Sequence, residues 1–578
     1  MLIPVRAFAK SALPSLKAHG LAVVVFAAAA FFWAVISWSK GLEQCTSDLL
    51  IYFGIVLKEH DASLFPRDLL FGDRKTYLHF PLFTEFLKYF FERTGDLTYG
   101  LKLLTFPLNF LYMLGAYVFF GWLTRNRPAA TLLSLLSSLP LSIPLGAENF
   151  GIGPATLMTP RVLFTAFVPA VLYLYYRAMI EKNTRMLLGA FFLLGVLANV
   201  YAISAFLLVQ VLLLLVIFRF GFNLAALLTV GRCGLLSFVG SLPSVVFFLT
   251  RSRGVDEDLP VEMLAEVFRW RIPYAYPQAI LLGKMPESVL HALTGAIALA
   301  PLIFLWTYRR RRQPAALRCL LLVCCAAAAY MADSGSNRYY VLFAGLTLVA
   351  PWNREMDEKD ELSLSFGFSV FYVGVVGVMV IQAVYAFFGM APIPIIHQFR
   401  AIRFSGFLLF LLAAICVKWF LLPPGGILPG IRIAVAALGV LVAFMGVRDA
   451  YRTHARTRES AETADLVRMA SWAKAHTAKE ALFLFDSPLF RILAERSLVV
   501  ATKDVGMFIV AKRNVREAYG RLQEIGSREK DVAGLLGIAA RYGAEYVVLR
   551  RKDFPALTER GIAYRDGTYV LLAVARTA

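Results

Sequence analysis

The chain has 578 residues, of which 59% are hydrophobic and only 17% are charged, and its mean hydropathy is +0.64. This composition excludes an ordinary soluble globular protein, because so much apolar surface cannot be buried within soluble domains. The net charge of +20 does not indicate nucleic-acid binding, since many basic residues fall in short loops between apolar segments, where membrane topology explains them. We therefore expect a polytopic membrane protein.

Apolar windows of the length that a helix needs to cross a bilayer recur along most of the chain. They predict a mainly α-helical, polytopic transmembrane domain of about 13 spans. The spans are predicted near residues 20–38, 101–122, 129–147, 161–180, 187–199, 203–218, 226–249, 290–307, 316–332, 338–351, 363–387, 403–421 and 429–447.

The positions of the basic loops predict how the chain is oriented. Arg6, Lys10 and Lys17 precede the first span, and basic residues beside a span are retained in the cytoplasm. Short basic loops then recur at every second connection between spans, which places them on the same side as the N-terminus. An odd number of spans places the C-terminal segment outside together with loop 39–100. We expect a multi-pass protein of the bacterial cytoplasmic (inner) membrane with a cytoplasmic N-terminus.

The composition changes after about residue 447, so we predict two domains: a transmembrane domain, 1–447, and a small soluble α/β domain, 448–578. Strands alternating with helices predict a partly parallel sheet. No glycine-rich nucleotide motif or nucleophile elbow is present, which favours an accessory or acceptor-side domain over a second enzyme. Strands are predicted at 481–485, 497–502, 546–550 and 568–574, and helices at 456–475, 488–495, 513–525 and 530–542.

The segment 46–80 carries the most informative polar residues, because it follows the first span directly. It contains Asp48, Asp61, Asp68 and Asp73. No predicted span has a charged residue securely at its midpoint, whereas ion-coupled carriers usually need ionisable groups at that depth. The acidic loop therefore indicates chemistry or binding at the outer membrane surface rather than transport.

Later outer loops supply cations and aromatic residues that would face this acidic loop. Arginine forks match phosphate oxygens, and a carboxylate in the same cavity deprotonates an attacking hydroxyl. This combination predicts glycosyl transfer from a lipid-linked phosphosugar. No metal ligands are predicted, and a divalent cation is compatible with the pattern without being required by it. The candidate donor-phosphate and substrate-binding residues are Arg161, Arg271, Tyr274, Tyr276, Arg338, His397, Arg400 and Arg403.

The layout resembles the GT-C superfamily of polytopic glycosyltransferases, which use lipid-phosphate sugar donors and place a catalytic carboxylate in the first outer loop. Asp48, in TSDLLIY, matches that position. The chain is more narrowly similar to a bacterial branch with an LFPxD element, an Arg-x-Pro-aromatic motif, an HxxR-like loop and an outer α/β tail. The corresponding segments here are LFPRD at 64–68, RIPYAYP at 271–277, HQFR at 397–400, ALFLF near Trp472, and YGAEYVV at 542–548.

The chain also departs from that pattern in two loops. Tyr274 and Tyr276 stand where the branch has histidines, and NVYAIS at 199–204 replaces a common His-Pro turn. These differences argue against imidazole groups binding metal or phosphate there. The aspartate and arginine positions remain as the resemblance implies.

Each candidate also has a structural interpretation. Asp48 is well placed to cap a helix, and Asp68 follows Phe65-Pro66 as a turn residue does. Arg161 opens a span, where arginines commonly snorkel to lipid headgroups. Arg271 lies between aromatic and proline residues, where a cation rests on ring faces, and His397, Arg400 and Arg403 are also typical of an interfacial anchor.

From these residues we predict an inverting membrane glycosyltransferase with Asp48, and secondly Asp68, as catalytic carboxylates. The donor is a polyprenyl-phosphate sugar, the acceptor is a glycan, lipid or protein at the outer face, and the context is cell-envelope polysaccharide synthesis. Nucleic acid is not an expected partner. Two alternatives stay open: a lipid-linked glycan flippase or ligase, and a non-enzymatic membrane scaffold that presents the C-terminal α/β domain.

Overall fold

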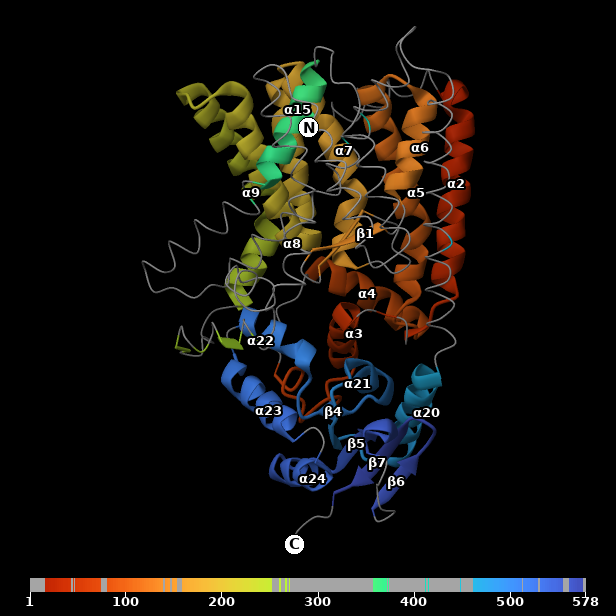
Figure 1. Ribbon diagram of the computed structural model, residues 1–578. Coiled ribbons are helices and arrows are strands. Elements are labelled where there is room, and N and C mark those ends of the chain that lie inside the picture. Colours follow the sequence, from red (N-terminus) through yellow and green to blue (C-terminus); the bar gives the residue numbers. More distant parts are fainter. Residues whose placement is uncertain are drawn as a thin grey trace, which may run out of the picture.

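A computed structural model of the whole chain shows a layer of long helices and a small α/β domain at one end of it (Figure 1). The structure describes residues 16–42, 45, 47–73, 81–138, 141–145, 148–152, 159–251, 357–371 and 461–574, with short gaps in the last range and a few single positions elsewhere. The predicted spans from 290 to 351 and from 403 to 447 lie outside these residues, apart from isolated positions.

Five helices in the described part of the chain are long and apolar enough to cross a membrane. Their outward side chains include Leu21, which is 81% exposed, and Leu235, which is 63% exposed; in a bilayer such apolar surface faces lipid. The protein is therefore a multi-pass membrane protein, as predicted. The five helices are α2 (Leu16–Trp38), α5 (Tyr99–Thr124), α7 (Pro160–Ile180), α8 (Thr184–Phe220) and α9 (Leu224–Arg251).

Helix α8 is folded back on itself at Tyr201, which has non-helical backbone angles (φ −152°, ψ 86°). Tyr175 of α7 contacts both of its arms: its ring packs against Phe191, and its hydroxyl donates to the Leu212 carbonyl at 2.8 Å. A straight helix would separate residues 191 and 212 by about 31 Å, which one side chain cannot span. The predicted spans 187–199 and 203–218 are thus the two antiparallel arms of α8.

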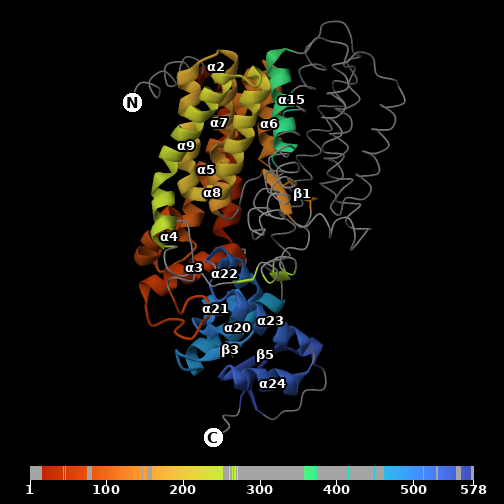
Figure 2. The ribbon, with the colours of Figure 1, turned by 90° about the vertical axis from the view of Figure 1, so that its left-hand side faces the viewer.

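The prediction of a helical span at 129–147 is wrong. Helix α6 (Arg127–Ser137) has 11 residues, about 16 Å, which is half of a bilayer core. Pro140 and Pro144 follow it, and proline removes the backbone donor that a helix needs. The chain continues instead as an antiparallel hairpin of β1 (Leu141–Leu145) and β2 (Glu148–Ile152), drawn part-way along the layer in both views (Figures 1 and 2).

Ring and hydrogen-bond contacts fix the direction of the helices. His19 of α2 contacts Tyr117 of α5, while Trp38 contacts Tyr99, so these two helices are antiparallel. The end of the layer where α5 finishes, which we call the basic end, carries Arg125, Arg127, Arg177, Lys182, Arg185 and Arg219. Helix α15 (Glu358–Phe371) packs there, with Glu358 2.8 Å from Arg219.

The α/β domain lies at the other end of the layer (Figure 1). Its five-stranded sheet has the order β4-β3-β5-β7-β6, with β3 parallel to β4 and to β5 and the remaining pairs antiparallel. The predicted partly parallel sheet is confirmed. Its strands are β3 (Leu482–Leu484), β4 (Ser497–Leu498), β5 (Tyr546–Arg550), β6 (Ile562–Arg565) and β7 (Tyr569–Ala573); β6 was not predicted.

Alternate residues of the sheet bury opposite faces, as strand geometry requires. Phe483, Val548 and Leu571 belong to a small core beneath α20 (Ala461–His476) and α21 (Pro488–Ala494). Their neighbours Leu484 and Leu549 join the large core, which is continuous with the helical layer. The helices on that side are α22 (Val505–Ala511), α23 (Val515–Ser527) and α24 (Val532–Arg541).

The crossing of α8 and α9 depends on glycine. A Cβ atom on Gly195 would lie 2.1 Å from the Ser237 carbonyl oxygen, whereas one on Gly189 in the same helix would meet nothing within 4 Å. Asn199 then ties the two helices by donating to the Gly240 carbonyl at 2.9 Å and accepting from the Ser244 N–H at 2.9 Å. The position of the α8 fold is therefore set by close backbone contact.

We expect Gly195→Ala to lower the melting temperature of the detergent-solubilised protein, because overpacking of this kind costs about 1–3 kcal/mol or more. Gly189→Ala is the matched control and should leave the melting temperature equal or higher, since alanine favours helix. Equal melting temperatures for the two variants would contradict the close crossing.

Candidate functional site

The acidic loop lies between the helical layer and the α/β domain, as two views a quarter-turn apart show (Figures 1 and 2). It contains helix α3 (Ser47–His60), and helix α4 (Pro81–Thr94) follows it. Helix α3 packs against α4 on one side and against α21 of the α/β domain on the other. The first extramembrane loop and the C-terminal domain therefore occupy one end of the layer, opposite the basic end.

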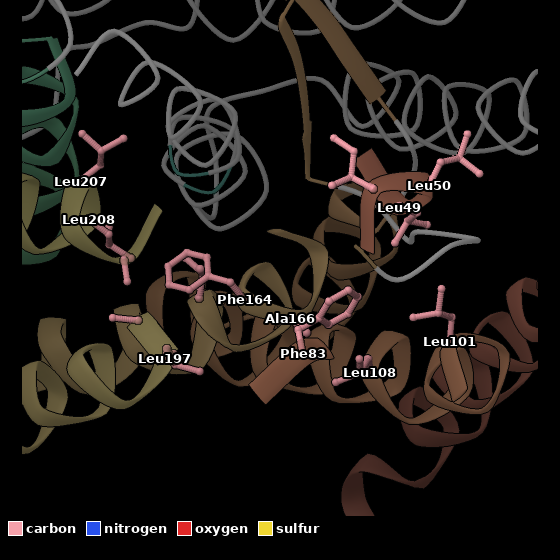
Figure 3. Close-up of a cluster of buried hydrophobic side chains, with 14 of the residues drawn as sticks. Leu49, Leu50, Phe83, Leu101, Leu108, Phe164, Ala166, Leu197, Leu207 and Leu208 are labelled. Carbon is pink, nitrogen blue, oxygen red and sulfur yellow. The ribbon is translucent and has the colours of Figure 1, made fainter. Parts of the chain in front are cut away.

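An apolar cluster holds the start of α3 against the membrane helices (Figure 3). Leu49 and Leu50 are 0% and 5% exposed, and Phe164 at the start of α7 is 1% exposed. Phe83, Leu101 and Leu197 bring α4, α5 and α8 into the same cluster. Asp48 immediately precedes this buried pair, so its backbone is fixed although its own side chain is exposed.

All four aspartates of the acidic loop form ion pairs with cations of the α/β domain. In a fifth ion pair the charges are reversed: Arg67 of LFPRD, in the acidic loop, pairs with Glu545 of the α/β domain at 2.6 Å. The acidic loop is therefore the surface on which the α/β domain docks. The aspartate pairs are Asp48 with Lys503 (2.5 Å), Asp61 with Lys479 (2.6 Å), Asp68 with Arg491 (2.9 Å) and Asp73 with Arg513 (2.6 Å).

Asp68 belongs to a buried ionic group, which we call the Arg491 triad: Asp68, Arg491 and Asp504. The three side chains are at most 1% exposed. Arg491 reaches Asp68 through Nε at 2.9 Å and donates from Nη1 to Asp504 Oδ1 at 3.0 Å. Burial raises the pKa of Asp504, against the opposing charge of Arg491. Burial alone would lower the pKa of Arg491, but the charges of Asp504 and Asp68 outweigh it and raise that pKa.

The Asp68 carboxylate also accepts hydrogen bonds from three backbone N–H groups. Oδ1 accepts from the Leu70 and Phe71 N–H groups at 3.0 and 3.2 Å, and Oδ2 accepts from the Leu498 N–H at 2.9 Å. A general base needs a free lone pair facing its substrate. These contacts are those of the turn interpretation of Asp68, and its catalytic role stays a prediction.

The LFPRD segment is shaped to present Asp68. Phe65 is fully buried and adopts a left-handed φ of 54°, a conformation uncommon for aromatic residues. Its ring packs 5.4 Å from that of Phe71, and Phe71 in turn covers the Arg491 guanidinium at 5.2 Å. Gly54 of α3 leaves room for this ring, because a Cβ there would approach Phe71 to 2.3 Å.

Asp48 is the most exposed of the four aspartates. Its side chain is 62% accessible, compared with 41% for Asp73, 40% for Asp61 and 0% for Asp68. It lies inside the first turn of α3 rather than preceding the helix, so it is not the N-cap residue that the structural interpretation expected. A carboxylate in this turn is favoured by the helix dipole.

Two tyrosines share the surroundings of Asp48. Tyr52 follows it by one helical turn, and Tyr201 lies at the fold of α8. Burial raises the pKa of Tyr52 well above its ordinary value, and the nearby Tyr201 and Asp48 raise it further. Tyr52 therefore keeps its hydroxyl proton to a higher pH than an ordinary tyrosine does. We call the group of Asp48, Tyr52, Tyr201 and Lys503 the Asp48 site.

Arg161 begins α7 at the same end of the layer. Thr159 caps the helix, Pro160 occupies its first position, and Arg161 follows with a half-buried side chain. No described carboxylate lies within ion-pair distance of it. The other predicted binding residues, Arg271, Tyr274, Tyr276, Arg338, His397, Arg400 and Arg403, lie outside the described residues.

The α/β domain also contacts the segment before the predicted Arg-x-Pro motif. Tyr519 of α23 donates to Glu266 Oε1 at 2.8 Å, and its ring lies 5.6 Å from that of Trp270. Burial and the bond to Glu266 raise the pKa of Tyr519 to about 12. The domain thus contacts both the acidic loop and this segment, which are about 200 residues apart in the sequence.

Three residues of this arrangement were not predicted from the sequence: Lys503, Arg491 and Asp504. Two signals pointed to them. Arg491 stands inside the apolar run PLFRILA, where a buried charge requires a partner. Lys503-Asp504 directly follows the buried strand predicted at 497–502, and the ends of strands in a partly parallel sheet are where sites assemble. Neither signal identified the partner in the acidic loop.

Within the described residues, no three histidine, cysteine, aspartate or glutamate side chains are grouped closely enough to hold a metal ion.

The fold defines a multi-pass helical membrane protein that carries a docked α/β domain over its first extramembrane loop. No protein-family model matches the sequence, and no curated protein matches it. Among solved structures, the chain is similar to ArnT from Cupriavidus metallidurans, whose crystal structure contains undecaprenyl phosphate. The alignment covers 97% of this chain and 99% of that one, with 13% identity and a TM-score of 0.40; similarity at this level does not define the family.

We expect Arg491→Met to loosen the α/β domain from the acidic loop, because it leaves two buried carboxylates without their counter-ion, a loss of about 3–5 kcal/mol. Limited proteolysis of the full-length protein in nanodiscs should release the domain much faster than in the wild type. Arg528→Met is the matched control, since Arg528 pairs with Asp531 at the surface, where both side chains are about half exposed, and such pairs contribute little. Equal proteolysis of the two variants would exclude the triad as the anchor.

Proposed function

We propose that the protein is a membrane glycosyltransferase that moves a sugar from a polyprenyl-phosphate donor to an acceptor hydroxyl, with Asp48 as the catalytic base. The observation that carries this proposal is an accessible carboxylate on a rigid helix, at the end of a membrane-spanning layer and beside a lysine and a neutral tyrosine. The GT-C-like placement of Asp48 in the first outer loop supports the same assignment.

In the proposed reaction, Asp48 accepts the proton of the acceptor hydroxyl as the acceptor oxygen attacks the anomeric carbon. The bond between that carbon and the donor phosphate oxygen breaks, and its electron pair leaves with the polyprenyl phosphate. Attack from the face opposite the leaving group inverts the anomeric configuration. The residues proposed to hold the phosphate are Arg161, Arg271, Arg338, His397, Arg400 and Arg403, with Tyr274 and Tyr276 beside them.

The proposed location is the outer face of the bacterial cytoplasmic membrane, with the basic end of the layer in the cytoplasm. Clustering of arginine and lysine at that end supports this orientation. An acceptor that is a glycan, a lipid or a protein would approach from the side of the α/β domain. The product would then belong to the cell envelope.

A second candidate function is a non-enzymatic scaffold that presents the α/β domain. One observation favours it: every aspartate of the acidic loop, Asp48 included, pairs with that domain. If docking were the whole purpose of these residues, Asp48 and Asp61 would be equivalent, since both pair with a lysine at nearly the same distance (2.5 and 2.6 Å).

The two functions are separated by Asp48→Asn and its matched control, Asp61→Asn. The transferase proposal expects Asp48→Asn to reduce cell-surface glycan in a complemented deletion strain at least about 100-fold, as loss of a general base does, while Asp61→Asn retains most product. Both variants should accumulate in the membrane at wild-type levels. Unchanged glycan in Asp48→Asn, or an equal loss in both variants, would exclude Asp48 as the base.

A further inference from the structure

Lys503 comes from the α/β domain but belongs to the surroundings of Asp48. It is the middle residue of a short 3₁₀ turn, Thr502–Asp504, that follows β4. Its Nζ atom lies 2.5 Å from Asp48 Oδ1, and its side chain is 28% exposed. The ammonium group is therefore within reach of any anion that binds beside Asp48.

The backbone of Lys503 is held from both sides. The Thr502 N–H donates to Asp486 Oδ1 at 2.9 Å, and Asp504 accepts from the Ala501 N–H at 3.2 Å. Asp504 is also the member of the Arg491 triad that follows Lys503 directly. The same triad contains Asp68 of the acidic loop, so it fixes where Lys503 meets Asp48. The lysine stem stays flexible while its base is rigid.

The proposed reaction moves one negative charge across the site. At the start the charge is on Asp48; when Asp48 has taken the acceptor proton it is neutral, and the polyprenyl phosphate has gained the electron pair of the broken bond. A cation that pairs with Asp48 at rest and then with the phosphate would follow this charge. Such a cation stabilises the transition state, where the charge is developing on the leaving group.

We propose that Lys503 is this cation: it pairs with Asp48 in the resting protein and binds the departing phosphate during the reaction. The α/β domain then contributes a substrate-binding residue to the membrane site, and Arg491 is a positioning residue that acts through Lys503. This inference rests on the proposed function and adds to it the role of the C-terminal domain. It replaces the expectation of a merely accessory or acceptor-side domain.

Lys479 provides an internal comparison. It comes from the same domain, pairs with an aspartate of the same loop, and is about as exposed as its partner, 40% each. Its partner Asp61 follows the end of α3, whereas Asp48 lies at the start, which separates the two aspartates by about 20 Å. Loss of docking would affect Lys479 and Lys503 variants alike, but loss of phosphate binding would affect only the Lys503 variant.

The test measures binding of undecaprenyl phosphate to the full-length protein in phosphatidylcholine nanodiscs, with uncharged undecaprenol as the reference ligand. We expect Lys503→Met to weaken binding of the phosphate at least about tenfold, the loss of one charge-assisted contact. Lys503→Arg should stay within about threefold of the wild type and Lys479→Met within about twofold. Binding of undecaprenol should not change in any variant.

Asp48→Asn supplies a test of opposite sign. Removing the carboxylate frees Lys503 from its resting partner, so this variant should bind undecaprenyl phosphate more tightly than the wild type. The double variant Asp48→Asn/Lys503→Met should lose that gain. A general loosening of the domain would weaken binding in both variants instead.

The outcomes separate this inference from the proposed function. If Lys503→Met binds undecaprenyl phosphate as tightly as the wild type, Lys503 does not have the proposed role. The same follows if Lys479→Met weakens binding as much as Lys503→Met does. Either result leaves the transferase proposal standing. Displacement of the ligand by phosphatidylglycerol would identify Lys503 as a general headgroup contact and would also overturn it. Absence of phosphate-dependent binding in the wild type overturns both.

Discussion

The position of the α/β domain depends on one buried arginine. Arg491 lies between Asp68 of the acidic loop and Asp504 of its own domain, with all three side chains nearly inaccessible. Charges removed from water are costly unless they are paired and hydrogen-bonded. All three charges are therefore paired only when the domain is docked in this one register, since any displacement would leave a buried charge without its partner.

That register determines the environment of Asp48. Lys503 adjoins Asp504 in the chain, so the contact that satisfies Arg491 also brings the lysine ammonium to the exposed carboxylate. On the membrane side of Asp48, Leu49 and Leu50 join the apolar cluster that includes Phe164 and Leu197 (Figure 3). The site is thus positioned from both directions: by apolar packing on the membrane side and by ion pairs on the side of the domain.

The four aspartates of the acidic loop are chemically alike but have different surroundings. Asp61, Asp68 and Asp73 hold the α/β domain, and burial separates Asp68 from the others because its carboxylate has no access to solvent. Asp48 keeps most of its surface exposed and remains the one aspartate of the four that we propose as a base. The difference arises from the surroundings of each carboxylate, since all four have the same intrinsic acidity.

The sequence alone determined the membrane class, most of the described helices and four of the five strands of the partly parallel sheet, because apolar length and periodicity are local properties of the chain. It failed at 129–147, where hydropathy outweighed the signal of Pro140 and Pro144. It selected the acidic loop but not the different exposure and ion pairing of Asp48 and Asp68. Only the tertiary structure decided these, because exposure and ion pairing depend on residues such as Arg491 and Lys503, more than 400 positions away.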